Sequence, residues 1–123
     1  MKRALAWTAP LLTACALLRP GGPPVETEVV ARSHNASDVD VYLLCGDSDA
    51  EWLGVVPRQS GASLAIRPAR RLCARGLNFF LLVRSQGRGY WAGPIRPQRS
   101  DGVVLVIEKY AGLSSVEVRS GGL

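Results

Sequence analysis

Apolar and polar residues alternate along most of the chain after residue 25, and turn-forming residues interrupt the alternation at intervals of about 8–12 residues. Because successive side chains of a β-strand point to opposite faces, this period of two predicts short, half-buried strands. Spacing of this kind is typical of an all-β antiparallel sandwich or barrel, and we expect the sandwich. We expect seven or eight strands, drawn from the segments Glu26–Ser33, Val39–Cys45, Ala50–Val56, Ala62–Ile66, Leu77–Arg84, Tyr90–Ile95, Val103–Lys109 and Ser114–Arg119.

One phase of the alternation in these strands is apolar and is expected to face a shared interior. The segment 103–107 is apolar in both phases, which is typical of a strand in the middle of a sheet or covered on both faces. The longest interval between strands, residues 67–76, has room for one helical turn at Pro68–Cys73. The expected interior residues are Val41, Leu43, Leu53, Val55, Phe79, Leu81, Leu105, Val116 and Val118.

A different pattern occupies the N-terminus. Lys2 and Arg3 precede an apolar run over residues 4–14, which is too short to span a bilayer and is typical of an export signal. The sequence LTAC at residues 12–15 resembles the bacterial lipobox, in which a small residue precedes the cysteine that is acylated. We therefore predict a lipoprotein signal peptide over 1–14 and lipidation of Cys15, which becomes the first residue of the mature chain.

The same residues allow a second interpretation. Ala14–Cys15–Ala16 also fits the A-x-A site of ordinary signal peptidase, and cleavage there would release a secreted protein without lipid. Residues 15–25 are rich in proline and glycine and are predicted to be a tether. One β-sandwich domain is then predicted over 26–119, followed by a short C-terminal tail, 120–123.

The charge of the mature chain is small. Loss of Lys2 and Arg3 reduces the 15 basic residues to 13, against ten acidic ones. No basic run with interleaved aromatic residues follows the signal, so a nucleic-acid partner is not predicted.

Cysteine usage agrees with export. Once Cys15 is assigned to the lipid or the signal, Cys45 and Cys73 remain as an even pair, which predicts a disulfide in an oxidising compartment. The bridge would close a loop of 29 residues. The alternative is two free cysteines that pack as small apolar side chains.

The sequence offers little for catalysis. His34 is the only histidine, it lies beside a predicted turn, and no serine stands in a G-x-S-x-G elbow. Asp47, Asp49 and Glu51 alternate through a turn, but the EF-hand pattern is absent, so we predict no metal and no cofactor. An enzyme is not expected, and a hydrolase is the least favoured function.

Two groups of residues are candidates for ligand binding. Trp52, Tyr90 and Trp91 would form an aromatic platform for a sugar if they were exposed, whereas aromatic residues in strands more often belong to the core. The cluster Arg70, Arg71 and Arg75 would attract anions, and the competing interpretation is local pairing with acidic turns.

Several strand and turn sequences resemble a known group of proteins. They are N-x-S-x-V-x-V-Y at residues 35–42, W-L-G-x-V at 52–56, V-L-V-I at 104–107 and S-S-V-E-V at 114–118. Together they are similar to small uncharacterised exported bacterial lipoproteins with an immunoglobulin-like β-sandwich, over most of residues 28–118. The resemblance implies an immunoglobulin-like antiparallel sandwich and carries no assigned activity.

These observations predict a non-enzymatic exported bacterial lipoprotein that acts as a binding or structural module of the cell envelope. We expect a membrane partner through the N-terminal lipid, on the periplasmic or surface side, and an envelope protein or a glycan as a further partner. The alternative is a β-sandwich module that binds a glycan or a small ligand.

Overall fold

The computed structural model describes residues 25–46 and 48–123 of the chain. The predicted signal peptide over 1–14, the predicted lipidation of Cys15 and residues 15–24 of the predicted tether lie outside the described residues. The strands are β1 (Thr27–Ser33), β2 (Val39–Cys45), β3 (Ser48–Val56), β4 (Gly61–Ile66), β5 (Leu77–Val83), β6 (Arg88–Ile95), β7 (Gly102–Ile107) and β8 (Ser115–Arg119).

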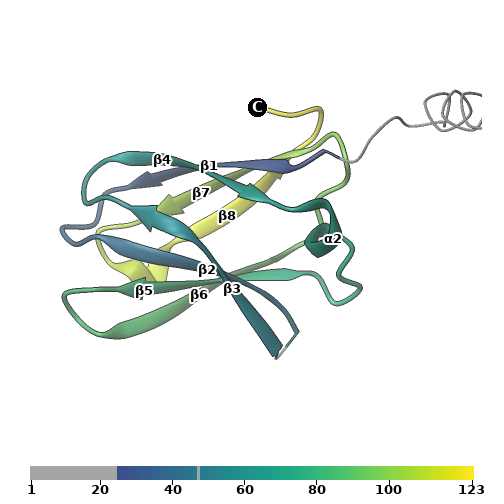
Figure 1. Cartoon of the computed structure of the whole chain (residues 1–123). Helices are drawn as coiled ribbons and strands as arrows, with labels where there is room; N and C mark the ends of the chain where they lie inside the picture. Colours follow the sequence, from purple (N-terminus) through teal and green to yellow (C-terminus); the bar gives the residue numbers. More distant parts are fainter. Residues whose placement is uncertain (1–24, 47) are drawn as a thin grey trace, which may run out of the picture.

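The strands form two four-stranded sheets that pack face to face (Figure 1). One sheet has the order β4-β1-β7-β8, and the other has the order β3-β2-β5-β6. All neighbours are antiparallel except β1 and β7, which run parallel. The prediction of an all-β sandwich is confirmed.

The strand order does not follow the immunoglobulin arrangement. In that arrangement the first strand lies beside the second, and the third, sixth and seventh strands share a sheet. Here β1 lies between β4 and β7, and β3 lies at an edge beside β2. The immunoglobulin-like detail is therefore not confirmed. Alternation within a strand predicts the strand itself but does not specify which strands become its neighbours.

The elements between the strands are short. The helix α2 (Pro68–Arg71) lies where one helical turn was predicted, although it ends two residues before Cys73. A 3-10 turn, η1 (Ala111–Leu113), precedes β8. None of the helices in the described part of the chain is long and apolar enough to cross a membrane.

The interior between the sheets contains most of the predicted core. Val41, Leu43, Phe79, Leu81 and Leu105 are fully buried, and Phe79 is the largest of the fully buried side chains. In β7 the buried phase is that of Leu105, so Val104 and Val106 lie on the outer face. Leu53, Val116 and Val118 are half-buried and pack against the core.

The prediction that Val55 faces the interior was wrong. Val55 is paired with Asp40 on the outer face of its sheet, and the buried residue of this strand is Val56. The register of β3 against β2 shifts between Gly54 and Trp52, which places one extra residue, Leu53, in β3. Such a bulge reverses the phase of the alternation, so Leu53 and Val55 do not share a face as a regular strand would require.

Candidate functional site

Four aromatic residues lie in register across the outer face of the sheet β3-β2-β5-β6. Trp52 of β3 is paired with Tyr42 of β2, Tyr42 with Phe80 of β5, and Phe80 with Trp91 of β6. Directly opposed residues on neighbouring strands share a face. We call Trp52, Tyr42, Phe80 and Trp91 the aromatic row.

The two tryptophans at the ends of the row are the most exposed of its members. Trp52 is 55% exposed and Trp91 58% exposed, whereas Tyr42 and Phe80 between them are half-buried. The ring centroids of Phe80 and Trp91 lie 4.9 Å apart in an edge-to-face arrangement, and those of Tyr42 and Phe80 lie 6.5 Å apart. Ring pairs at such separations attract one another, which holds Tyr42, Phe80 and Trp91 together without burying Trp91.

Gly89 makes room for the row. The ring of Phe80 occupies the position that a side chain at residue 89 would take, because a Cβ added there would overlap Cζ of Phe80. Gly89 is opposite Leu82, one outward position along from Phe80 and Trp91. A glycine beneath an aromatic ring is a recurrent device in sheets, and here it lets Phe80 lie across the β6 strand.

A buried carboxylate fixes one end of the row. Asp40 of β2 accepts hydrogen bonds from Nε and Nη2 of Arg84, at 2.8 and 3.0 Å, and from the indole N–H of Trp52 at 3.0 Å. Hydrogen bonding from Arg84 holds the pKa of Asp40 below its ordinary value, against the opposing effect of burial. The hydrogen bond from the indole N–H to this paired carboxylate orients the Trp52 ring.

Acid is expected to weaken this arrangement. A carboxylate with a lowered folded-state pKa stabilises the fold above its unfolded pKa of about 3.9, and that contribution is lost as the pH falls through the folded value. We expect Asp40→Asn to lower the free energy of unfolding by a constant amount above about pH 5. The difference from the native chain should shrink as the pH falls through the lowered pKa of Asp40. Urea denaturation at a series of pH values measures the difference.

Glu117→Gln is the matched control for this prediction. Glu117 also pairs with an arginine, Arg119, at 2.8 Å, but both side chains are more than half exposed. Exposed ion pairs contribute little, so this variant should follow the native chain at every pH. An Asp40→Asn variant with the native stability at pH 7 would show that the carboxylate does not stabilise the fold.

Tyr90 does not join the two tryptophans, although all three were candidates for one platform. It lies opposite Leu81 on the inward phase of β6, where it packs against the core, and its hydroxyl donates to Oε1 of Gln86 at 3.0 Å. Consecutive residues of a strand face opposite sides, so Tyr90 and Trp91 cannot share a regular sheet face. The alternation in the sequence was enough to predict that Tyr90 and Trp91 face opposite sides and that Tyr42 points outward.

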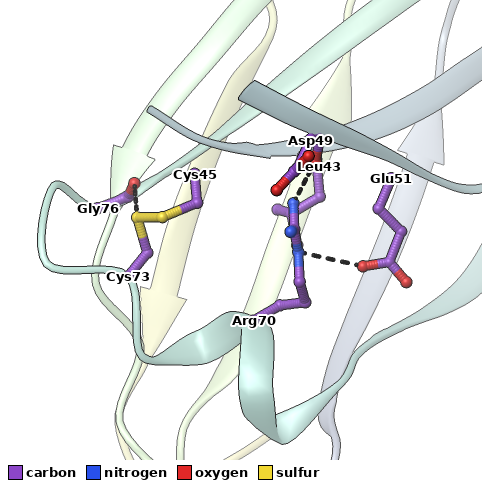
Figure 2. The surroundings of a disulfide bond; sticks show 7 residues. All are labelled: Leu43, Cys45, Asp49, Glu51, Arg70, Cys73 and Gly76. Atoms are coloured by element: carbon purple, nitrogen blue, oxygen red, sulfur yellow. Dashed lines mark hydrogen bonds and ion pairs between the residues drawn. A yellow bond between two sulfur atoms is a disulfide. The ribbon is translucent and has the colours of Figure 1, made fainter. Parts of the chain in front are cut away.

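The loop arginines mainly bind groups of the chain itself. Arg70 donates to the carbonyl oxygens of Leu43 and Asp49, and its Nε lies 3.2 Å from Glu51 Oε1 in an ion pair that lacks hydrogen-bond alignment (Figure 2). Arg71 donates to the carbonyl oxygen of Val25 and to Oγ1 of Thr27.

The third arginine of that predicted cluster, Arg75, is exposed. Arg75 lies within van der Waals distance of the position that a side chain at Gly46 would occupy. Arg67, next to α2, pairs with Glu51 at 2.9 Å. The arrangement ties the segment around α2 to β2 and β3, and it leaves less free charge for an anion than the sequence suggested.

The predicted disulfide is present beside this cluster. Cys45 at the end of β2 is bonded to Cys73, with the Cα atoms 5.7 Å apart (Figure 2). Sγ of Cys73 also lies 3.2 Å from the carbonyl oxygen of Gly76, a contact rather than a hydrogen bond because a bridged sulfur has no hydrogen to donate. The bridge and Arg70 together hold the α2 segment against the end of the sandwich.

His34 lies on the exposed β1–β2 loop, where its backbone N–H donates to the carbonyl oxygen of Ile107 at 2.7 Å. Beside it is an open hollow of about 480 Å³, formed by β1, β4 and the turn between β3 and β4. The residues that line this hollow include serines but no carboxylate, so they do not complete a Ser–His–Asp arrangement. Among the described residues, which omit Asp47, no three His, Cys, Asp or Glu side chains are placed to hold a metal ion together.

Comparison with known proteins adds little to this description. No family model matches the chain, and no curated protein matches it. A solved structure, the NMR structure of a protein from Eubacterium rectale, is similar at 10% sequence identity and a TM-score of 0.43, over 76% of this chain and 87% of that one.

Proposed function

We propose that this protein is a non-enzymatic binding module of a bacterial cell envelope, exported and held at a membrane through acylated Cys15, and that it contacts its target through the aromatic row. The exposed row carries the proposal. Trp52 and Trp91 are large apolar side chains that are more than half exposed on one sheet face, and exposed apolar residues grouped in this way are candidates for a contact surface. Tryptophan, tyrosine and arginine are also the side chains that contribute most of the energy at such surfaces.

Two further observations support export. The LTAC sequence at residues 12–15 has the form of a lipid-attachment site. The bond between Cys45 and Cys73 is of a type that persists in oxidising compartments and is rare in the reducing cytosol.

The proposed contact face is testable by photo-cross-linking in the bacterium that makes the protein. A photoreactive phenylalanine analogue replaces Trp91 in the full chain, and in a separate strain it replaces Arg32. Arg32 is exposed on the outer face of the opposite sheet, so it is a matched control. We expect covalent adducts of higher mass from position 91 and few from position 32, and equal adducts from both positions would contradict the proposal.

A further inference from the structure

We propose that two copies of the chain pair edge to edge through strand β4, antiparallel and centred on Ser63, so that their sheets join into one of eight strands. β4 lies at the edge of its sheet beside β1, on the side of the sandwich opposite the aromatic row (Figure 1). An edge strand presents unpaired backbone N–H and C=O groups that another strand can bind. A second copy related by a twofold axis presents the same edge in return.

The four edge strands among the described residues differ in how they are protected against such pairing. β3 contains the bulge at Leu53, β6 contains Pro94, and β8 carries Glu117 and Arg119. Bulges, prolines and charged side chains all hinder the addition of a strand. The six residues of β4 are uncharged, none is proline, and the register of β4 with β1 has no shift. β4 is therefore the edge best suited to accept another strand.

The free edge of β4 is open to solvent. Gly61 and Ser63 are exposed, and residues 63–65 line an open hollow of about 420 Å³ that Glu28 and Leu53 also line. Glu28 belongs to β1 and Leu53 to the other sheet, so the hollow passes along the edge of β4. A strand from a second copy would lie in this hollow and would cover Leu53, which is half-buried in the single copy.

Pairing centred on Ser63 places opposite charges in the same cross-strand row. Glu28 of β1 points outward opposite Ala65 of β4. Arg32 of β1 also points outward, opposite Gly61 of β4. When Ser63 is opposite its own copy, Ala65 is opposite Gly61 of the second copy. The row that begins at Glu28 therefore ends at Arg32 of the second copy, and the twofold axis repeats this pair.

The side chains of each pair can meet because the residues between them are small. Three strand spacings, about 14 Å, separate the two β1 strands. Glu28 already extends over β4, since its carboxylate accepts a hydrogen bond from Oγ of Ser63 at 3.2 Å. Arg32 is exposed beside the hollow over Gly61, and it has no hydrogen bond or ion pair within the described part of the chain.

Neighbouring registers lose this match of charges. A pairing centred on Ala62 would place Arg32 in the row of Val30 of the second copy. A pairing centred on Leu64 would place Glu28 in the row of Val30. A pairing centred between two residues would oppose inward-facing to outward-facing side chains. The charges of β1 therefore select the proposed register.

A cysteine at the centre of the pairing tests it. Ser63→Cys in the full chain would lie opposite its own copy with the Cα atoms about 5 Å apart, which suits a disulfide. Ala65→Cys is the matched control on the same strand and face, because two residues 65 would lie more than about 13 Å apart. Ser115→Cys is the exposed control, on the other edge strand of the same sheet. The purified chains are oxidised with copper phenanthroline and separated on non-reducing gels.

We expect Ser63→Cys to yield at least five times as much of a species with twice the mass of the chain as either control does. Equal yields from the three variants would show random collision of exposed thiols. No species of doubled mass from Ser63→Cys would show that β4 does not pair in this register. Either of these two results would overturn the proposal.

A charge swap tests the same register through the ion pairs. In the Ser63→Cys chain, the further change Glu28→Arg would place two arginines in each row, and we expect it to lower the yield of cross-linked chain at least fivefold. Addition of Arg32→Glu to that chain restores opposite charges and should restore the yield. A loss that this second change does not rescue would contradict the pairing of the two residues.

The dimer and the proposed function can fail separately, because they concern opposite sheets. Photo-cross-linking from position 32 replaces the arginine of both ion pairs, so that variant should be largely monomeric and remains a suitable control. Adducts from position 91 without a cross-linked pair from Ser63→Cys would leave the proposed function and remove the dimer. The reverse result would leave the dimer and remove the proposed function.

Discussion

Replacement of Phe79 by alanine is expected to lower the free energy of unfolding by about 3–5 kcal/mol. Phe79 is fully buried, and β5 lies between β2 and β6 in the middle of its sheet, so the surrounding strands cannot easily close the cavity. A domain of this size has a modest core and little stability in reserve, so much of the variant should be unfolded. Urea denaturation followed by circular dichroism measures the loss.

The next residue supplies a matched control. Phe80 has the same side chain on the same strand, but it points outward and is half-buried in the aromatic row. Phe80→Ala should cost less than half as much stability as Phe79→Ala. Equal losses from the two variants would contradict the assignment of the interior face.

Loss of the disulfide is the second large effect. Replacement of both Cys45 and Cys73 by alanine is expected to lower the free energy of unfolding by about 3.5 kcal/mol, because the unfolded chain regains the entropy of an open 29-residue loop. In a domain of this size that corresponds to a fall in Tm of roughly 15–25 °C. Differential scanning calorimetry measures it.

Reduction of the native protein provides the comparison for this variant. The reduced chain and the double-alanine chain should unfold at similar temperatures, both well below the oxidised chain. A double variant as stable as the oxidised protein would show that Arg70 and its partners hold the α2 segment without help from the bridge.

The strands could be predicted from the sequence because each depends on a local period of two. The alternation over Val39–Cys45 and Leu77–Val83 predicted both the elements and the buried phase. The bulge at Leu53 was not predictable, because residues 52–56 contain no polar side chain that would distinguish the inward from the outward phase. The order of the strands could not be predicted from local alternation either, because it depends on how the two sheets pack.

The candidate site could be predicted only in part. Trp52 and Trp91 were recognised as aromatic candidates, but they come together only through the register of β2 and β5, which inserts Tyr42 and Phe80 between them. The role of Gly89 likewise depends on the strand beside it. The arginines near α2 suggested an anion site because their carbonyl partners, from distant strands, cannot be seen in the sequence.

Photo-cross-linking at positions 91 and 32 in living cells decides whether the aromatic row is the surface that meets the envelope. Both positions are exposed, and they lie on opposite sheets of one sandwich, so the comparison reports which face contacts the target. We expect position 91 to yield discrete adducts of higher mass and position 32 to yield little. Abundant adducts from position 32, with none from position 91, would show that the protein uses its other face.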